Sequence, residues 1–318
     1  MDIVDVSSLK KSYGDFNAVN GVDFSIRKGE IFGFLGPNGA GKTSTINMMI
    51  GLSRPSGGTI TINGIDVINQ PKKAQAIMGI VPDESNLYPE MDGFNNLCFC
   101  ASLYGMPKKE RETRAKSLLE QFRLSDVGAR PFKAYSKGMR RRLTIAAGII
   151  HSPQVLFLDE PTTGVDIESA RQIRELILNL KKQGTTVFLT THYIEDAERI
   201  CDRIAFIVSG KIAAQGSVEE LMQSVSHGHR LEISSEKPIN RCSSDLQSLF
   251  GVTSVMAKNE HSLVLSSQNR LPLLSVLKYF DEQGVEIFEA KELRPSLEDV
   301  FVNVTGLEAS KLKKEKGA

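Results

Sequence analysis

The 318-residue chain has no tryptophan and only four cysteines, Cys98, Cys100, Cys201 and Cys242. None of the four belongs to a CxxC pair, and no histidine lies at metal-ligand spacing from any of them, so the sequence does not indicate a zinc site. We expect reduced cysteines that pack in the core of a cytoplasmic protein.

Long apolar runs and an excess of one charge are also missing. The chain carries 39 Lys and Arg residues against 38 Asp and Glu residues, a net charge of +1, whereas a dedicated nucleic-acid binder usually has a basic excess. No stretch approaches the ~18 apolar residues of a membrane-spanning helix, and Met1–Lys10 lacks the apolar core of a signal peptide. We therefore expect neither a membrane-spanning nor a secreted protein, although the composition does not exclude action at a membrane surface.

Two domains are expected from the length and from the order of the segments. Residues 1–222 alternate strand-like and helix-like stretches, which predicts an α/β domain, and a change to helical spacing at about 91–150 predicts a helical insertion. A polar break follows, and residues 230–306 predict a small α+β domain before a charged tail at 307–318. The strands expected in this second domain are Leu231–Ser235, Ser262–Ser266 and Val285–Ala290.

The most specific motif is Gly36–Thr43, which matches GxxxxGK[ST] between the apolar strand Ile31–Leu35 and a helical segment. Its glycines let main-chain N–H groups wrap a phosphate, and the following helix N-terminus adds partial positive charge. Lys42 is expected to reach the β- and γ-phosphates of a nucleotide, and the Thr43 hydroxyl to bind Mg²⁺. The nucleotide-binding residues predicted in this segment are Gly36, Pro37, Asn38, Gly39, Ala40, Gly41, Lys42, Thr43 and Ser44.

A second chemical element is the strand Val155–Leu158, whose end carries Asp159 and Glu160. Ligands of parallel sheets bind at the carboxyl ends of the strands, so both carboxylates are expected beside the phosphates. Asp159 would hold Mg²⁺, directly or through water. Glu160 would orient or deprotonate an attacking water.

Further motifs resemble those of the ATP-binding-cassette (ABC) ATPases. Residues 135–143, YSKGMRRRL, look like the LSGGQ signature of that family. His192 resembles its switch histidine, Asp166 its D-loop aspartate and Tyr13 the aromatic residue that stacks on adenine. The motifs occur in the family's order over residues 1–221, and the resemblance implies ATP as substrate and Mg²⁺ as cofactor. The residues that it adds for nucleotide binding are Tyr13, Ser136, Gly138 and Asp166, and those that it implies for catalysis are Lys42, Glu160 and His192.

Several of these residues have a simpler interpretation when taken alone. Tyr13 could be an aromatic side chain packed at a sheet edge, and His192 a hydrogen-bonded residue at a strand end. Asp166 could be the N-cap of the helix that follows it. The run Arg140–Arg142 is interpreted mainly as a solvated helix face.

The sequence departs from the family pattern at two motifs. In the signature, Lys137 stands in place of the first glycine and Met139 in place of glutamine. In the Q-loop, which couples the nucleotide to a membrane partner, Asp83 stands where the family usually has glutamine. Because aspartate is charged but shorter, Asp83 is expected to bind Mg²⁺ and to reach less far.

The resemblance also implies the assembly. A second copy of the chain, or a paralogous cassette, would complete a head-to-tail dimer in which the P-loop of one chain faces Ser136 and Gly138 of the other across ATP. The ATPase would then energise transport from the cytoplasmic face of the membrane, through a separate integral membrane permease.

Two alternatives are soluble ABC ATPases that act on ribosomes or on DNA. The chain has one cassette where the ribosomal factors have two, and it lacks the heptad run of the DNA-repair enzymes. The segment PSLEDVF at residues 295–301, with Thr305-Gly306 after it, resembles the end of an accessory domain found on ABC-2 type exporters. We therefore predict export without a nucleic-acid partner, with the choice of cargo made by the permease.

Overall fold

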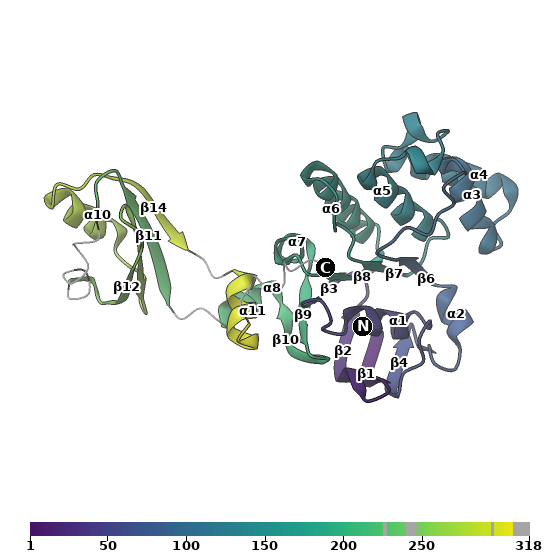
Figure 1. Ribbon diagram of the computed structural model, residues 1–318, viewed down its shortest axis with the longest axis horizontal. Coiled ribbons are helices and arrows are strands. Elements are labelled where there is room, and N and C mark those ends of the chain that lie inside the picture. Colours follow the sequence, from purple (N-terminus) through teal and green to yellow (C-terminus); the bar gives the residue numbers. More distant parts are fainter. Residues whose placement is uncertain (225–227, 240–245, 247–248, 294–295, 308–318) are drawn as a thin grey trace. The chain divides into compact units, whose positions relative to one another are not determined.

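The computed structural model describes residues 1–224, 228–239, 246, 249–293 and 296–307. Cys242, Pro295 and residues 308–318 of the predicted tail lie outside the described residues. The chain divides into two compact units, which we describe separately (Figure 1). The larger unit comprises Met1–Val218 and the described residues from Val304 on, and the smaller unit comprises Glu219–Asn303.

Two sheets form the framework of the larger unit. The six-stranded sheet has the order β10-β9-β3-β8-β7-β6, and its neighbouring strands run parallel except for β10 and β9. Its strands are β3 (Ile31–Leu35), β6 (Met78–Val81), β7 (Val155–Asp159), β8 (Thr186–Thr191), β9 (Arg203–Val208) and β10 (Lys211–Ser217). The antiparallel sheet has the order β2-β1-β4-β5, with strands β1 (Asp2–Tyr13), β2 (Phe16–Arg27), β4 (Gly57–Ile62) and β5 (Ile65–Asp66).

A cluster of phenylalanines joins the two sheets. The ring of Phe24 on β2 lies 5.5 and 5.4 Å from the rings of Phe32 and Phe34 on β3, and Phe188 on β8 contacts all three. Every residue of β3 is buried, because a mainly parallel sheet is covered on both faces. This core aligns β3, β7 and β8 in register, so that their carboxyl ends meet at one edge of the sheet.

Helices cover the other face of the six-stranded sheet. Figure 1 shows α3, α4, α5 and α6 on the side of this sheet away from β1 and β2. The helical insertion predicted at 91–150 contains α3 (Gly93–Leu103), α4 (Lys108–Gln121), α5 (Lys137–Gly148) and the 3-10 turns Ser125–Val127 and Phe132–Ala134. The remaining helices of the larger unit are α1 (Lys42–Met49), α2 (Pro71–Gln75), α6 (Ile167–Lys182) and α7 (Ile194–Ile200). Within the described residues, no helix is both long enough and apolar enough to cross a bilayer.

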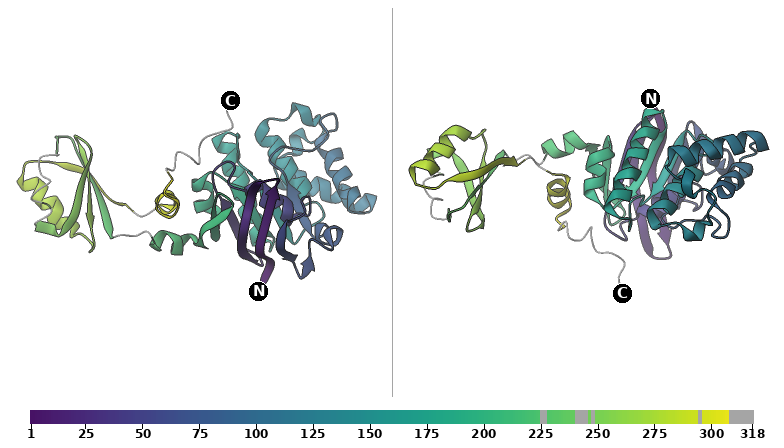
Figure 2. Two further views of the ribbon diagram at one scale, coloured as in Figure 1. Left: turned by 60° about the horizontal axis from the view of Figure 1, so that its bottom comes forward. Right: turned by 90° about the horizontal axis from the view of Figure 1, so that it is seen from above.

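The smaller unit has its own sheet and its own core. Its antiparallel strands have the order β12-β13-β11-β14, and α10 covers one face of the sheet (Figure 2). The core includes Ile233, Leu265, Val276 and Phe280, which are fully or almost fully buried. The predicted fold class, an α/β domain with a helical insertion and a small α+β domain, is thereby confirmed. The elements are α8 (Val218–Ser224), β11 (His229–Ser235), β12 (Val252–Asn259), β13 (Ser262–Ser267), α10 (Leu273–Glu282), β14 (Ile287–Leu293) and α11 (Leu297–Thr305).

Candidate functional site

A cavity of about 470 Å³ lies at the carboxyl ends of the parallel strands and brings most of the predicted site residues together. Phe16, Ala18, Lys137, Thr163 and Gly164 also line it and were not predicted as site residues. The predicted residues that line it are Tyr13, Pro37, Asn38, Gly39, Gly41, Lys42, Thr43, Ser44, Asp83, Asp159, Glu160 and His192.

The P-loop can follow its path only because two positions are glycine. A Cβ at Gly36 would lie 2.2 Å from the carbonyl oxygen of Ile207, and a Cβ at Gly41 would lie 2.5 Å from that of Ala18. Gly41 also has a φ of 107°, which side chains disfavour, and it is the residue directly before α1. The loop therefore stays close to β9 and β2 and presents the N-terminus of α1 to the cavity.

Lys42 is buried at the base of the cavity, with 6% of its surface exposed. Its Nζ donates to the carbonyl oxygens of Gly36, at 2.7 Å, and Pro37, at 3.3 Å. The same Nζ lies 3.4 Å from Oε1 of Glu160. The ammonium group is thus held between the P-loop and the predicted catalytic carboxylate.

Glu160 is the residue on which the polar groups converge. Its Oε2 lies 2.9 Å from Nδ1 of His192 and accepts a hydrogen bond of 3.1 Å from the Thr163 hydroxyl. Burial opposes ionisation of this carboxyl, but the hydrogen bond with His192 and the charge of Lys42 outweigh burial and lower the pKa of Glu160 below its ordinary value. The group is therefore a carboxylate near neutral pH, as an acceptor of a proton must be.

Asp159 has a different environment. Burial raises its pKa above the ordinary value, while the hydroxyl of Thr190 opposes the shift by donating to Oδ1. Asp83 and Glu160 lie close enough to add to the shift by charge repulsion. A cation between these carboxylates would relieve that repulsion, and the donor set of Thr43, Asp83 and Asp159 consists of the oxygen ligands that Mg²⁺ prefers.

Ser136, Gly138 and Asp166 lie together but do not line this cavity. The Ser136 hydroxyl caps α5 by accepting from the main-chain N–H of Met139 at 3.2 Å. A Cβ at Gly138 would lie 2.1 Å from Oγ of Ser169, so the start of α5 packs directly on the start of α6. Asp166 caps α6 by accepting from the N–H of Ser169 at 2.8 Å, which is the simpler role considered for it.

The rim of the cavity carries two exposed aromatic rings. Tyr13 is 51% exposed and Phe16 64% exposed, and the two residues are paired in register at the turn between β1 and β2. Tyr13 is therefore not a packed edge aromatic in this structure. Phe16 was missed, although an apolar ring beside a turn glycine, Gly14, is a signal that the sequence contains.

The interpretation of Arg140–Arg142 as a solvated face is wrong for the middle residue. Arg141 is only 7% exposed. Its guanidinium donates to the carbonyl oxygens of Pro161 and Asp83, both at 3.0 Å, and also to those of Pro82 and Asp159. The helix turns this residue toward the strand ends, while Arg140 is exposed.

Comparison with known proteins decides the family. The family model described as ABC transporter matches residues 19–163, and the model of the C-terminal domain of DrrA1-3-like ATP-binding proteins matches residues 216–305. The daunorubicin resistance ATP-binding protein DrrA3 of Streptomyces coeruleorubidus is 35% identical over 95% of this chain and 96% of its own length. This chain belongs to the ABC transporter ATP-binding proteins. It is an ABC-type ATPase, and the predicted C-terminal accessory domain of the exporter type is confirmed.

Other relatives of this ABC ATPase are similar over the same length. The Nod factor export ATP-binding protein I of Ralstonia nicotianae is 36% identical over 96% of this chain and 94% of the relative. The linearmycin resistance ATP-binding protein LnrL of Bacillus subtilis is 34% identical over 96% of this chain and 98% of the relative.

Solved structures of ABC ATP-binding subunits resemble most of this chain. The structure of an ATP-binding subunit of an ABC transporter has 30% sequence identity and a TM-score of 0.64, and the match covers 70% of this chain and 92% of that one. A dimeric ATP-binding cassette in a post-hydrolysis state with ADP and Pi has 25% identity and a TM-score of 0.62, over 67% of this chain and 98% of that one.

Proposed function

We propose that this ABC ATPase drives export through a separate integral membrane permease, from the cytoplasmic face of the membrane. The names of the relatives support export, since they refer to drug resistance and to Nod factor export over nearly the whole chain. We keep the predicted domain limits, 1–222 and 230–306, within this proposal.

The observation that carries the chemistry is the convergence of Lys42 and His192 on Glu160 inside the cavity. When ATP is bound, its γ-phosphate would take the place of Glu160 as the partner of the Lys42 ammonium. Glu160, released from Lys42 but still hydrogen-bonded to His192, would orient a water and accept its proton. Tyr13 would stack on the adenine at the rim.

We propose Mg²⁺ as the cofactor, which when bound neutralises charge on the phosphates. Thr43 and Asp159, with Asp83, would hold it. Among the residues that the structure describes, no group of three or more His, Cys, Asp or Glu side chains is placed to hold a metal ion. The remaining ligands would therefore come from ATP and water, as is usual for Mg²⁺ at phosphates.

We propose that the active form is a dimer of two cassettes, either two copies of this chain or this chain with a paralogue. Ser136 and Gly138 do not line the cavity of their own chain, which supports a role at the nucleotide of the partner. There the N-terminus of α5 would donate to phosphate oxygens.

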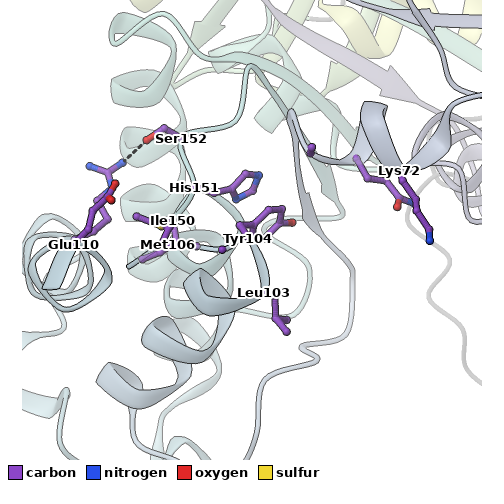
Figure 3. Close-up of a pocket in the computed structure, with 12 residues that line it drawn as sticks. Lys72, Leu103, Tyr104, Met106, Glu110, Ile150, His151 and Ser152 are labelled. Carbon is purple, nitrogen blue, oxygen red and sulfur yellow. Dashed lines mark hydrogen bonds between the residues drawn. The ribbon is translucent and has the colours of Figure 1, made fainter. Parts of the chain in front are cut away.

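We propose that the permease contacts a second cavity, which has a volume of about 900 Å³. It lies beside the helical insertion, where Tyr104 stacks on His151 with 3.5 Å between ring centroids (Figure 3). Leu103 is 70% exposed at its rim, and Lys72 and Glu110 contribute charges of both signs. We propose that a short amphipathic helix from a cytoplasmic loop of the permease occupies it, because such a helix pairs apolar with charged groups.

Affinity purification tests this function. The tagged full-length chain, isolated from detergent-solubilised membranes of its native cells, is expected to bring a membrane-spanning protein with it. Leu103→Glu should reduce this recovery at least about tenfold, since it places a charge in an apolar contact. Leu274→Glu, at a leucine of α10 that is 68% exposed, is the matched control. It should bring down as much of the membrane-spanning protein as the wild type does. Recovery with ribosomes instead, or no effect of Leu103→Glu, would contradict the proposal.

A further inference from the structure

Arg141 connects α5, the helix that begins in the signature segment, to the two loops that carry the predicted metal-binding carboxylates and Glu160. It lies near the start of α5, and its guanidinium reaches main-chain oxygens after β6, at Pro82 and Asp83, and around the end of β7, at Asp159 and Pro161. Arginine has five N–H donors in a planar fork, so it can serve several carbonyl groups at once, which a lysine ammonium cannot do with the same geometry.

Two of these carbonyls bracket Glu160. The residue before it, Asp159, and the residue after it, Pro161, both accept from Arg141. Glu160 itself has a φ of +48°, a conformation that residues other than glycine rarely adopt. Its own N–H donates to Thr190, to the main-chain oxygen at 3.1 Å and to Oγ1 at 3.2 Å. Such a conformation persists where the surroundings hold it from several sides. Arg141 provides the hydrogen bonds on the side of α5.

The charge of Arg141 also interacts with the carboxylates of this site. Burial lowers the pKa of its guanidinium, and the negative charges of Asp83, Asp159 and Glu160 oppose that effect. Because the acceptors described above are main-chain oxygens, Arg141 does not neutralise Glu160 by direct contact. Its hydrogen bonds go to the main chain on both sides of Glu160, while the carboxylate oxygens of Glu160 contact His192, Thr163 and Lys42.

We propose that Arg141 is a positioning residue for hydrolysis, which holds Glu160 and the Q-loop in place and ties them to the signature helix. This inference rests on the proposed role of Glu160. In the dimer, the start of α5 contacts the partner's nucleotide and Arg141 contacts the loops of its own chain. The same helix therefore links the two ATP sites, and a shift of α5 on one nucleotide changes the position of Glu160 at the other.

Substitutions in the full-length chain separate positioning from folding. Arg141→Met keeps an unbranched apolar stem and removes every donor. It is expected to lower kcat for ATP about 100-fold, the loss that a misplaced catalytic group produces, while the Kd for ATP stays within about threefold. Arg141→Lys, which keeps the charge and some of the N–H donors, should lower kcat about tenfold.

Arg142→Met is the matched control. Arg142 lies on the same helix, and its Nη1 donates to the carbonyl oxygens of Phe122 and Arg123, far in sequence from the carboxylates. This variant should lower the melting temperature as Arg141→Met does, but keep kcat within about threefold of the wild type.

A second readout distinguishes a positioning role from a general loss of structure. In a Glu160→Gln background, Arg141→Met should lower the single-turnover rate of ATP hydrolysis by less than about threefold more, because the effects of coupled residues are not additive. A full 100-fold further loss, an unchanged kcat for Arg141→Met, or an equal loss for Arg142→Met would overturn the inference.

If Arg141→Met does not fold, Arg141→Lys is the deciding variant, and an unchanged kcat of Arg141→Lys would overturn the inference. If the wild type itself neither binds nor hydrolyses ATP, the proposed function fails and this inference with it. If the wild type is active, a negative result concerns Arg141 alone.

Discussion

At the scale of single residues, Glu160 shows how burial and contacts compete. Burial alone would raise the pKa of its carboxyl, but the hydrogen bond with His192 and the nearby Lys42 ammonium lower it below the ordinary value. For Asp159, its neighbour, burial outweighs the hydrogen bond from Thr190 and the charge of Lys42, so the pKa is raised. Two adjacent carboxyl groups are thus given different proton affinities by their surroundings, which suits different roles.

Replacement of Glu160 tests its role directly. Glu160→Gln keeps the size of the side chain but removes the proton acceptor, so we expect kcat to fall about 10²- to 10⁴-fold with ATP still bound. Phosphate release and equilibrium ATP binding measure the two effects separately. Glu168→Gln is the control, because Glu168 is a carboxylate on α6 that pairs with Arg171 outside the cavity. Near-normal phosphate release by Glu160→Gln would exclude Glu160 as the base.

At the scale of elements, the site depends on strands and helices that meet from distant parts of the chain. Gly36 and Gly41 hold the P-loop against β9 and β2, and the phenylalanine cluster joins β2, β3 and β8. The helical signature segment packs on α6 through Gly138 and on the strand ends through Arg141. A substitution in this core should therefore disturb the geometry of the site even when no residue that lines the cavity is changed.

Phe188 tests the joint between the sheets. Phe188 is fully buried against Phe24, Phe32 and Phe34. Phe188→Ala is expected to lower the free energy of unfolding of the larger unit by about 3–5 kcal/mol, since it leaves a cavity in the core. Phe288→Ala, at a ring on β14 that is 64% exposed, should change stability by no more than about 0.5 kcal/mol. Urea unfolding measures both, and equal effects would contradict the proposed role of the cluster.

At the scale of the whole molecule, the two units have separate cores, and one cavity contains only part of the predicted site. Tyr13, Lys42, Asp159, Glu160 and His192 line it. Ser136, Gly138 and Asp166, although close to one another, do not. The proposed completion of the site by a second cassette would account for this division.

Dimer formation tests that completion. Glu160→Gln should bind ATP without consuming it, and we expect this variant to sediment as a dimer with ATP and Mg²⁺ and as a monomer without nucleotide. The combination of Glu160→Gln with Lys42→Ala should stay monomeric, because the ammonium that binds the phosphates is missing. A dimer that forms equally without ATP would contradict a nucleotide-bridged interface.

Part of this molecule could be predicted because its chemistry is local in the sequence. The P-loop between a strand and a helix, and the Asp159-Glu160 pair after a strand, are continuous segments whose backbone form follows from a few residues. The small domain was harder to predict: β12 was not foreseen, because most of its residues are exposed and lack an alternating pattern. Exposed strands are specified by their neighbours more than by their own composition.

The sequence by itself determined the class of fold and the family, and it predicted the residues that would meet a nucleotide, because motif spacing encodes them. Only the tertiary structure decided which residues support those groups. In a run of three arginines nothing distinguishes the middle one, but the phase of α5 turns Arg141 into the strand ends. The surroundings of Glu160 likewise come from His192, Thr163 and Lys42, which the fold brings together from three segments. Hydrogen bonds and pKa values depend on distances in space, and the order of residues along a chain does not contain those distances.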